Sequence, residues 1–186
     1  VQSLQGQFLI AMPSMGDPRF LRSVVYMVAH DSEGAMGFII NKRAEGLSLG
    51  DILKDMPETV VKTGLVNLPV YVGGPVQNDR GFVLHTSDYE KTHNTLSQEL
   101  PIALTQSADV LVDAAHGRGP EKMRLFLGYA GWGPGQIEGE LQDNAWLVCD
   151  ANIAEIFTSR SDDLYQKCVA TMGIDLASLS NEGGEA

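Results

Sequence analysis

Residues 123–146 read Met123-Arg-Leu-Phe-Leu-Gly-Tyr-Ala-Gly-Trp132-Gly-Pro-Gly-Gln-Ile-Glu138-Gly-Glu-Leu-Gln-Asp-Asn-Ala-Trp146. The apolar run at 123–127 is typical of a strand, and the polar stretch after Pro134 favours a short helix. Five glycines and both tryptophans of the chain fall in this stretch. A strand, a glycine-rich turn and a helix can present backbone N–H groups to a ligand. The same glycines also allow a tight turn beside a large indole, so two interpretations stand open.

The spacing of these glycines excludes the common nucleotide motifs. Residues 131–135 follow a G-x-G-x-G pattern rather than G-x-G-x-x-G, and no Gly-Lys-Ser/Thr follows them. A structural turn is the favoured interpretation, because glycine serves first to free the backbone. If the turn is instead a ligand site, Trp132 supplies stacking area and the N–H groups of the loop meet an anion or a carbonyl. Gln136 and Glu138 would then add polar specificity.

Short apolar and β-branched runs predict further strands. Most of them are nearly continuously apolar, which is typical of strands covered on both faces. The expected strands are 7–12, 23–29, 36–41, 70–73, 81–85, 102–106, 123–128 and 145–149. Helices are signalled by their caps. Ser48 opens a capping-box pattern ahead of a helix that Pro57 ends. Ser107 can cap a helix that carries Val110, Leu111, Ala114 and Ala115 and is stopped by Gly117 and Gly119. Asn152 or Ser161 begins the C-terminal helices.

The order of these elements predicts an α+β fold. Strands gather early and mix with helices late, which does not fit a strict βαβ repeat. A length of 186 residues without a Pro- or Ser-rich linker favours one domain over residues 1–180. The acidic end, residues 181–186, is expected to be a disordered tail.

Charge narrows the classes of function. Thirteen Lys+Arg against 24 Asp+Glu give a formal net charge of −11, whereas nucleic-acid binding depends on neutralising phosphates. Lys42-Arg43 and the separated Arg19 and Arg22 come closest to a basic cluster. Direct nucleic-acid binding is therefore disfavoured.

Targeting and metal signals favour a cytoplasmic protein without a cofactor. No apolar run approaches the roughly 18 residues of a membrane span, and the first residues lack the basic and apolar regions of a secretory signal. Cys149 and Cys168 form neither a disulfide framework nor a metal pair by spacing. The histidines are widely spread and no H-E-x-x-H occurs, so we expect no bound metal. Because no run is apolar enough to span a membrane, we also expect no membrane partner.

Several longer motifs, taken together, resemble a known family. In chain order they are Gly6-Gln-Phe-Leu-Ile-Ala-Met-Pro13, Met15-Gly-Asp-Pro-Arg-Phe20, Ser23-Val-Val-Tyr26, Gly34-Ala-Met-Gly-Phe-Ile-Ile-Asn-Lys42, Val72-Gly-Gly-Pro-Val76, Arg80-Gly-Phe-Val-Leu-His85, Gly128-Tyr-Ala-Gly-Trp-Gly-Pro-Gly-Gln136 and Asn144-Ala-Trp-Leu147. Their order and spacing are similar to the YqgE/AlgH family of small bacterial cytosolic proteins, over nearly the whole chain except the acidic tail. Ala29 rather than Glu precedes His30, which weakens an acid–histidine role at that position.

The resemblance implies an α+β fold with a branched, mostly antiparallel or mixed sheet. That sheet would be bent into a barrel-like core with helices packed outside. The resemblance implies no agreed biochemical activity. One branch of the family carries a name as a candidate transcriptional regulator of exopolysaccharide production, although no DNA-binding module is evident in it. We therefore expect any action on transcription to be indirect.

The leading hypothesis is a binding or regulatory protein without nucleophile–base catalysis. It would recognise a protein or a small molecule in one cleft formed by the turn at 73–75, the strand at 80–85 and the turn at 131–138. The candidate ligand-binding residues are Gly73, Gly74, Pro75, Arg80, His85, Gly131, Trp132, Gly133, Gly135, Gln136 and Glu138. On this hypothesis the variant Trp132→Ala loses binding. The expected state is a monomer or a weak homodimer.

Two other classes of function stay open. A hydrolase-like enzyme would use His85 with a carboxylate such as Asp88 or Glu138, provided that these groups lie within hydrogen-bond reach. A direct DNA-binding regulator predicts DNA retention that falls steeply with salt, against the acidic net charge. Catalysis by cysteine is not favoured, because Cys149 and Cys168 both fall at apolar positions.

Overall fold

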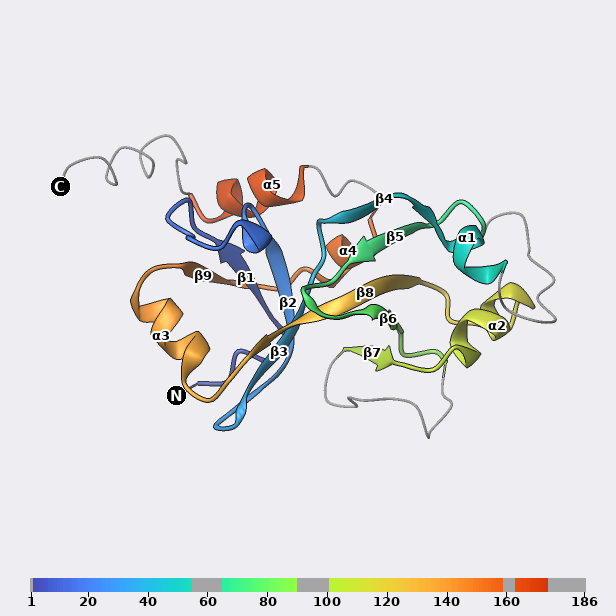
Figure 1. Ribbon diagram of the computed structural model, residues 1–186, viewed down its shortest axis with the longest axis horizontal. Coiled ribbons are helices and arrows are strands. Elements are labelled where there is room, and N and C mark those ends of the chain that lie inside the picture. Colours follow the sequence, from blue (N-terminus) through green and yellow to red (C-terminus); the bar gives the residue numbers. More distant parts are fainter. Residues whose placement is uncertain (1, 55–64, 90–100, 159–162, 174–186) are drawn as a thin grey trace.

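The computed structural model describes residues 2–54, 65–89, 101–158 and 163–173, and one long strand runs through its centre (Figure 1). This strand, β8 (Met123–Trp132), pairs with three others. Its first half pairs in parallel with β5 (Pro69–Val72) and antiparallel with β6 (Val76–Thr86). Its second half pairs antiparallel with β3 (Gly34–Ile39). The expected strand, turn and helix at 123–146 are confirmed, and the strand extends further than expected, through Trp132.

From β8 the sheet continues in two arms. The first arm runs from β3 through β2 (Val24–Asp31) and β1 (Gln7–Ala11) to β9 (Trp146–Asp150), with every pair antiparallel. The second arm holds β5 with β4 (Arg43–Ser48), and β6 with β7 (Ile102–Thr105) as a side branch. The α+β class and the branched, mixed sheet are confirmed. The barrel-like core is wrong for the strands that the structure describes, because the branch at β8 sends the arms apart and the end strands β4 and β9 do not pair.

Glycines stand where the two arms diverge. The N–H of Gly73 donates to the carbonyl of Leu127 in β8 at 2.8 Å, and the Gly73 carbonyl accepts from the N–H of Ile39 in β3 at 2.7 Å. One residue thus joins both arms. Gly128 has a φ of 71°, and a Cβ on it would lie 2.5 Å from the carbonyl oxygen of Gly74. The backbones approach too closely here for side chains, which explains why the chain has glycine at these points.

Alternate residues of the first arm face different layers. In β2, Val24 and Tyr26 belong to a buried cluster with α5 (Leu164–Thr171) and α4 (Ile153–Ile156), whereas Val25 and Met27 belong to a cluster with α3 (Gln136–Gln142). Successive side chains of a strand point to opposite faces. Helices therefore cover both faces of this arm, which explains its nearly continuous apolar runs. A third cluster packs α1 (Leu49–Leu53) and α2 (Asp109–Ala115) against the second arm.

Two helices begin at their expected caps. Ser48 caps α1 through a complete capping box with Asp51, and the side chain of Asn152 accepts a hydrogen bond at the start of α4. The N-cap of α2 is Ala108 rather than Ser107 and makes no side-chain cap hydrogen bond, although the hydroxyl of Ser107 accepts from the N–H of Asp109 at 3.2 Å. No helix in the described ranges is long and apolar enough to cross a membrane.

One strand, β4 (Arg43–Ser48), has a weak sequence pattern, and three predicted boundaries lie outside the described residues. The sequence predicts no strand at β4, because Arg-Ala-Glu-Gly-Leu-Ser has no β-branched run. Pro57, Ser161 and the limit between domain and tail at residue 180 lie outside the described residues. The single domain and the disordered tail therefore stay predictions.

Candidate functional site

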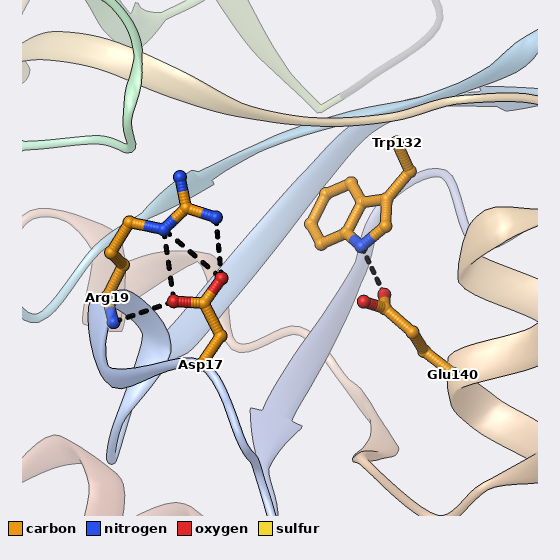
Figure 2. A network of polar contacts seen from close by, with 4 residues as sticks. All are labelled: Asp17, Arg19, Trp132 and Glu140. Atoms are coloured by element: carbon orange, nitrogen blue, oxygen red, sulfur yellow. Dashed lines mark hydrogen bonds and ion pairs between the residues drawn. The ribbon is translucent and has the colours of Figure 1, made fainter.

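The indole of Trp132 is a core side chain. It is 6% exposed, and its ring centroid lies 6.3 Å from that of Phe20 and 6.0 Å from that of Trp146. Its Nε1–H donates to Glu140 Oε2 at 2.6 Å, which links β8 to α3 (Figure 2). The ring therefore offers little free area on which a ligand could stack.

The glycine turn after Trp132 uses its own N–H groups. The N–H of Gly133 donates to the Gln136 side chain at 3.0 Å, and the N–H of Gln136 donates back to the Gly133 carbonyl at 3.1 Å. Pro134 has no N–H to offer. Gly135 has a φ of 74° at the N-cap of α3, a conformation that glycine adopts without steric cost. This geometry fits the structural turn, with Gln136 closing the turn instead of facing a ligand.

The other segments of the expected cleft lie in separate surroundings. Residues 73–75 lie at the branch of the sheet, where the two glycines are buried. Residues 80–81 line a hollow together with Gln106 and Ser107. Residues 131–132 line a different hollow, between β3 and β8. These two hollows share no residue, and neither brings the three predicted segments together.

His85 is fully buried, and both of its ring nitrogens are engaged. Nδ1 donates to the carbonyl of Thr86 at 2.8 Å, and Nε2 accepts from the hydroxyl of Thr105 at 2.7 Å. The tautomer is fixed because a carbonyl can only accept. Asp88, the carboxylate expected beside this ring, instead accepts from Thr86 Oγ1 at 2.5 Å, and that bond lowers the pKa of Asp88. A hydrolase-like reaction therefore finds no free base in the His85 ring.

The structure forms a histidine–carboxylate pair that the sequence pattern does not predict. His30 Nε2 lies 2.6 Å from Glu138 Oε1, which joins β2 to α3, and the N–H of Leu4 donates to His30 Nδ1 at 3.0 Å. Since Nδ1 accepts, Nε2 carries the proton and donates to the carboxylate. The acid comes from 108 residues away, so neither Ala29 nor any local spacing could signal it. With both nitrogens engaged, the pair fastens the N-terminal segment and α3 to the sheet.

Replacing Glu138 with glutamine is expected to flatten the acid side of the stability curve. The bond from His30 lowers the pKa of Glu138 in the folded protein. Its stabilising contribution is therefore complete above the ordinary glutamate pKa of about 4.3 and is lost as the pH falls through the lower folded value. The difference in free energy of unfolding between wild type and Glu138→Gln should be smallest at acidic pH, grow as the pH rises through the lowered pKa of Glu138, and level off above the ordinary glutamate pKa.

Urea denaturation across this pH range measures that difference. Glu45→Gln is the matched control, because Glu45 is exposed and makes no ion pair with any residue that the structure describes. The same pH response in both variants would contradict the role assigned to Glu138.

The loop between β1 and β2, residues 12–23, is fastened at several points. The ring of Phe20 packs against Trp132 and Trp146. Arg19 holds Asp17 through two side-chain nitrogens, with a shortest N–O distance of 2.6 Å (Figure 2). This ion pair lowers the pKa of Asp17. The loop therefore presents its remaining side chains from a defined backbone.

Arg22 ends this loop in an unusual conformation. Its φ is 56°, in the left-handed region that side chains other than glycine rarely adopt. Asn41 fixes the backbone there, because its Nδ2 donates to the Arg22 carbonyl and its Oδ1 accepts from the N–H of Val24, both at 2.9 Å. The Arg22 guanidinium carbon lies 4.9 Å from the ring centroid of Tyr165, whose hydroxyl donates to the Ala11 carbonyl at 2.6 Å. Both ends of Arg22 are thus held in place.

The loop, the turn after β3 and α5 line an open surface hollow of about 430 Å³, which we call the loop hollow. It is lined by Pro18, Arg19, Leu21, Arg22, Ser23, Asn41, Lys42 and Tyr165. Three of these side chains are cations and none is a carboxylate, in a chain whose net charge is −11. Arg22 and Lys42 make no ion pair with any described carboxylate. The sequence places these basic residues in two separate segments, and the fold brings them to one hollow.

The described residues form no metal cluster, and their two cysteine thiols are poor nucleophiles. No three His, Cys, Asp or Glu side chains among these residues gather in a way that could hold a metal ion. Burial raises the pKa of the Cys168 thiol to about 11 and also raises the pKa of Cys149. Both thiols are therefore protonated near neutral pH, and a protonated thiol is a poor nucleophile.

Comparisons with known proteins agree with the motifs. A family profile described as AlgH-like matches residues 8–177. A UPF0301 protein of Afipia carboxidovorans is 45% identical over 191 residues, which cover 98% of this chain and 90% of that protein. A UPF0301 protein of Ruegeria pomeroyi is 43% identical over 183 residues, which cover 98% of this chain and 99% of that protein.

Two solved structures share the fold. The solution structure of AlgH from Pseudomonas aeruginosa matches with a TM-score of 0.80 and 42% identity, covering 100% of this chain and 97% of that one. The crystal structure of a protein from Corynebacterium diphtheriae matches with a TM-score of 0.72 and 22% identity, covering 95% of this chain and 91% of that one, and shows the fold alone. These names give a family and a fold and state no reaction. The profile match over most of the length and the identities above 40% show that the chain belongs to the AlgH-like, UPF0301 family.

Proposed function

We propose that this protein is a non-catalytic binding protein and that it binds its ligand in the loop hollow. The observation that carries the proposal is a hollow of about 430 Å³ whose wall holds two cations, Arg22 and Lys42, without an ion-pair partner among the described residues. Small-molecule sites commonly have volumes of about 300–1,000 Å³ and a few placed polar groups. The loop hollow has both properties.

The titratable groups support binding rather than catalysis. His30 and His85 each have both ring nitrogens in hydrogen bonds within the protein, so neither offers a free base in this conformation. Cys149 and Cys168 are protonated thiols. The loop hollow itself is lined by donors and cations, which hold a ligand but do not abstract a proton from it.

A regulatory role of such a protein would be indirect. DNA binding draws most of its affinity from neutralising a row of phosphates, whereas the net charge here is −11 and the loop hollow is one local basic site. A ligand in the loop hollow would instead change the affinity of this protein for a protein partner. The chain would act as a monomer or a weak homodimer in the cytoplasm.

Fragment binding is expected to perturb the loop hollow and not the glycine turn. We would titrate a library of neutral and charged fragments into the ¹⁵N-labelled full chain and follow the backbone amides. Shifts should concentrate at Arg22, Ser23 and Lys42, because these residues line the preformed hollow. The amides of residues 133–136 should stay in place, since the turn is closed by its own hydrogen bonds.

The double variant Arg22→Gly, Lys42→Ala should lose the shifts that negatively charged fragments cause, because it removes both lining cations that have no ion-pair partner among the described residues. Arg43→Ala is the matched control, because Arg43 is the next cation in the chain and does not line the hollow. Shifts at residues 131–138 that survive the double variant would overturn the location of the site. If no fragment shifts the amide signal of any residue that the structure describes, the binding function is overturned.

A further inference from the structure

We propose that the loop hollow binds a doubly charged oxyanion, supplied either by a phosphate monoester or by a dicarboxylate. The inference rests on the proposed function and names the chemistry of the ligand. It follows from the charge of the wall, from the way Arg22 is held, and from the neutral donors among the lining residues.

The charge of the wall matches two negative charges. Of the three cations, Arg19 is compensated, because two of its nitrogens hold the carboxylate of Asp17. Arg22 and Lys42 are left without a described carboxylate partner. A single negative charge would leave one of these two cations unpaired in the filled hollow, whereas a dianion pairs both.

The placement of Arg22 suits an oxyanion in particular. Its guanidinium lies against the ring of Tyr165, with the central carbon 4.9 Å from the ring centroid. The N–H groups of this guanidinium have no hydrogen-bond partner among the described residues, and its planar fork matches the oxygens of a carboxylate or a phosphate. The hydrogen bond from Tyr165 to the Ala11 carbonyl fixes the ring that orients the fork. Less ordering is then required when a ligand arrives.

Neutral donors complete the set. Ser23 lines the hollow although it is only 3% exposed, and its hydroxyl has no hydrogen-bond partner among the residues that the structure describes. Asn41 also lines the hollow. One N–H of its Nδ2 donates to the Arg22 carbonyl, and the other N–H has no acceptor among the residues that the structure describes. An amide nitrogen carries two such donors. A group with several oxygens can use all of these donors together.

Arg22 also allows a clean deletion of its charge. Its left-handed backbone, with a φ of 56°, is a conformation that glycine adopts without steric cost. The variant Arg22→Gly therefore removes the guanidinium and relieves the backbone at the same position. Lys42→Ala removes the other cation from an exposed side chain, so it provides a second variant that does not depend on the loop conformation.

Calorimetric titration of the full chain in phosphate-free buffer tests the inference. The probes are phenyl phosphate and succinate as dianions, and succinamide as the neutral match of succinate. We expect at least one dianion to bind, with Kd raised roughly tenfold or more in Arg22→Gly and in Lys42→Ala, since each loses a charge-assisted contact. Arg43→Ala should keep Kd within about twofold, because surface charges outside a site contribute little.

The two dianion titrations distinguish the two sources of the anion. Binding of phenyl phosphate alone assigns a phosphate monoester, and binding of succinate alone assigns a dicarboxylate. The second pKa of a phosphate monoester is near 6, so phenyl phosphate should bind more tightly at about pH 7.5 than at about pH 5.5. An unchanged Kd between these pH values would overturn the requirement for two charges.

Other results would overturn the oxyanion while sparing the proposed function, and one result would overturn both. Succinamide that binds as tightly as succinate, or a loss in Arg43→Ala equal to that in Arg22→Gly, would remove the oxyanion site. Neutral fragments that map to the loop hollow while both dianions fail would overturn the ligand chemistry and keep the binding function. Failure of every fragment and every dianion would overturn both.

Discussion

The variant Gly74→Ala is expected to be largely unfolded or barely stable. A Cβ at residue 74 would lie 2.2 Å from the carbonyl carbon and oxygen of Tyr129 and 2.4 Å from the nitrogen of Ala130. These are backbone atoms of β8, so no side-chain rotation can relieve the overlap and the strand itself must move. Overpacking of a core costs about 1–3 kcal/mol, and we expect about 3 kcal/mol or more here because both arms pair with the displaced strand.

Urea denaturation followed by far-UV circular dichroism measures this loss. Gly133→Ala is the control, because a Cβ there meets no atom within 4 Å and the residue has no positive φ. It should change the free energy of unfolding by no more than about 0.5 kcal/mol. A Gly74→Ala protein as stable as Gly133→Ala would show that the close approach at the branch is not required.

Trp132→Ala is expected to lower the free energy of unfolding by about 3–5 kcal/mol, the range for removing a buried tryptophan. The indole packs against Phe20 and Trp146 and is 6% exposed, so its removal leaves a cavity between the loop, β8 and β9. It also takes away the donor to Glu140. A loss of ligand binding in this variant would therefore report a weakened fold and not a lost ligand contact.

Trp132→Phe separates the two parts of that effect. Phenylalanine keeps most of the ring packing and removes the Nε1–H, so we expect a smaller loss, of about 1–2 kcal/mol. Chemical denaturation of wild type and both variants in one buffer gives the comparison. Equal stability of Trp132→Ala and wild type would contradict the placement of the indole in the core.

The elements of this fold could be predicted from the sequence because their signals are local. The apolar run of 123–127 and the capping box at Ser48 each lie within a few residues, and the structure confirms a strand and a helix there. Strand β4 could not be predicted in this way, because Arg-Ala-Glu-Gly-Leu-Ser pairs with β5 through tertiary context. The open sheet instead of a barrel also depends on pairings between distant segments, which no local pattern encodes.

The candidate site depends on such distant pairings even more. The sequence shows Arg19, Arg22 and Lys42 as scattered cations, and only the pairing of β2 with β3 sets them around one hollow. The predicted cleft depends on glycines at 73, 74, 131, 133 and 135, whose spacing cannot distinguish a close backbone approach from a ligand loop. His30 and Glu138 are 108 residues apart in the sequence, so no local pattern predicts their hydrogen bond.

The sharing of β8 between the arms limits how the chain can change in length. A single residue inserted in a strand turns every following side chain to the opposite face. Within residues 123–132 such an insertion would change which side chains face each side of the sheet in two sets of strand pairs. This is because β5 and β6 pair with the earlier residues of β8, and β3 pairs with residues 130–132. The outer strands β4, β7 and β9 each have one partner. We therefore expect insertions and deletions to be tolerated at the rim of the sheet and not within β8, which has three neighbours.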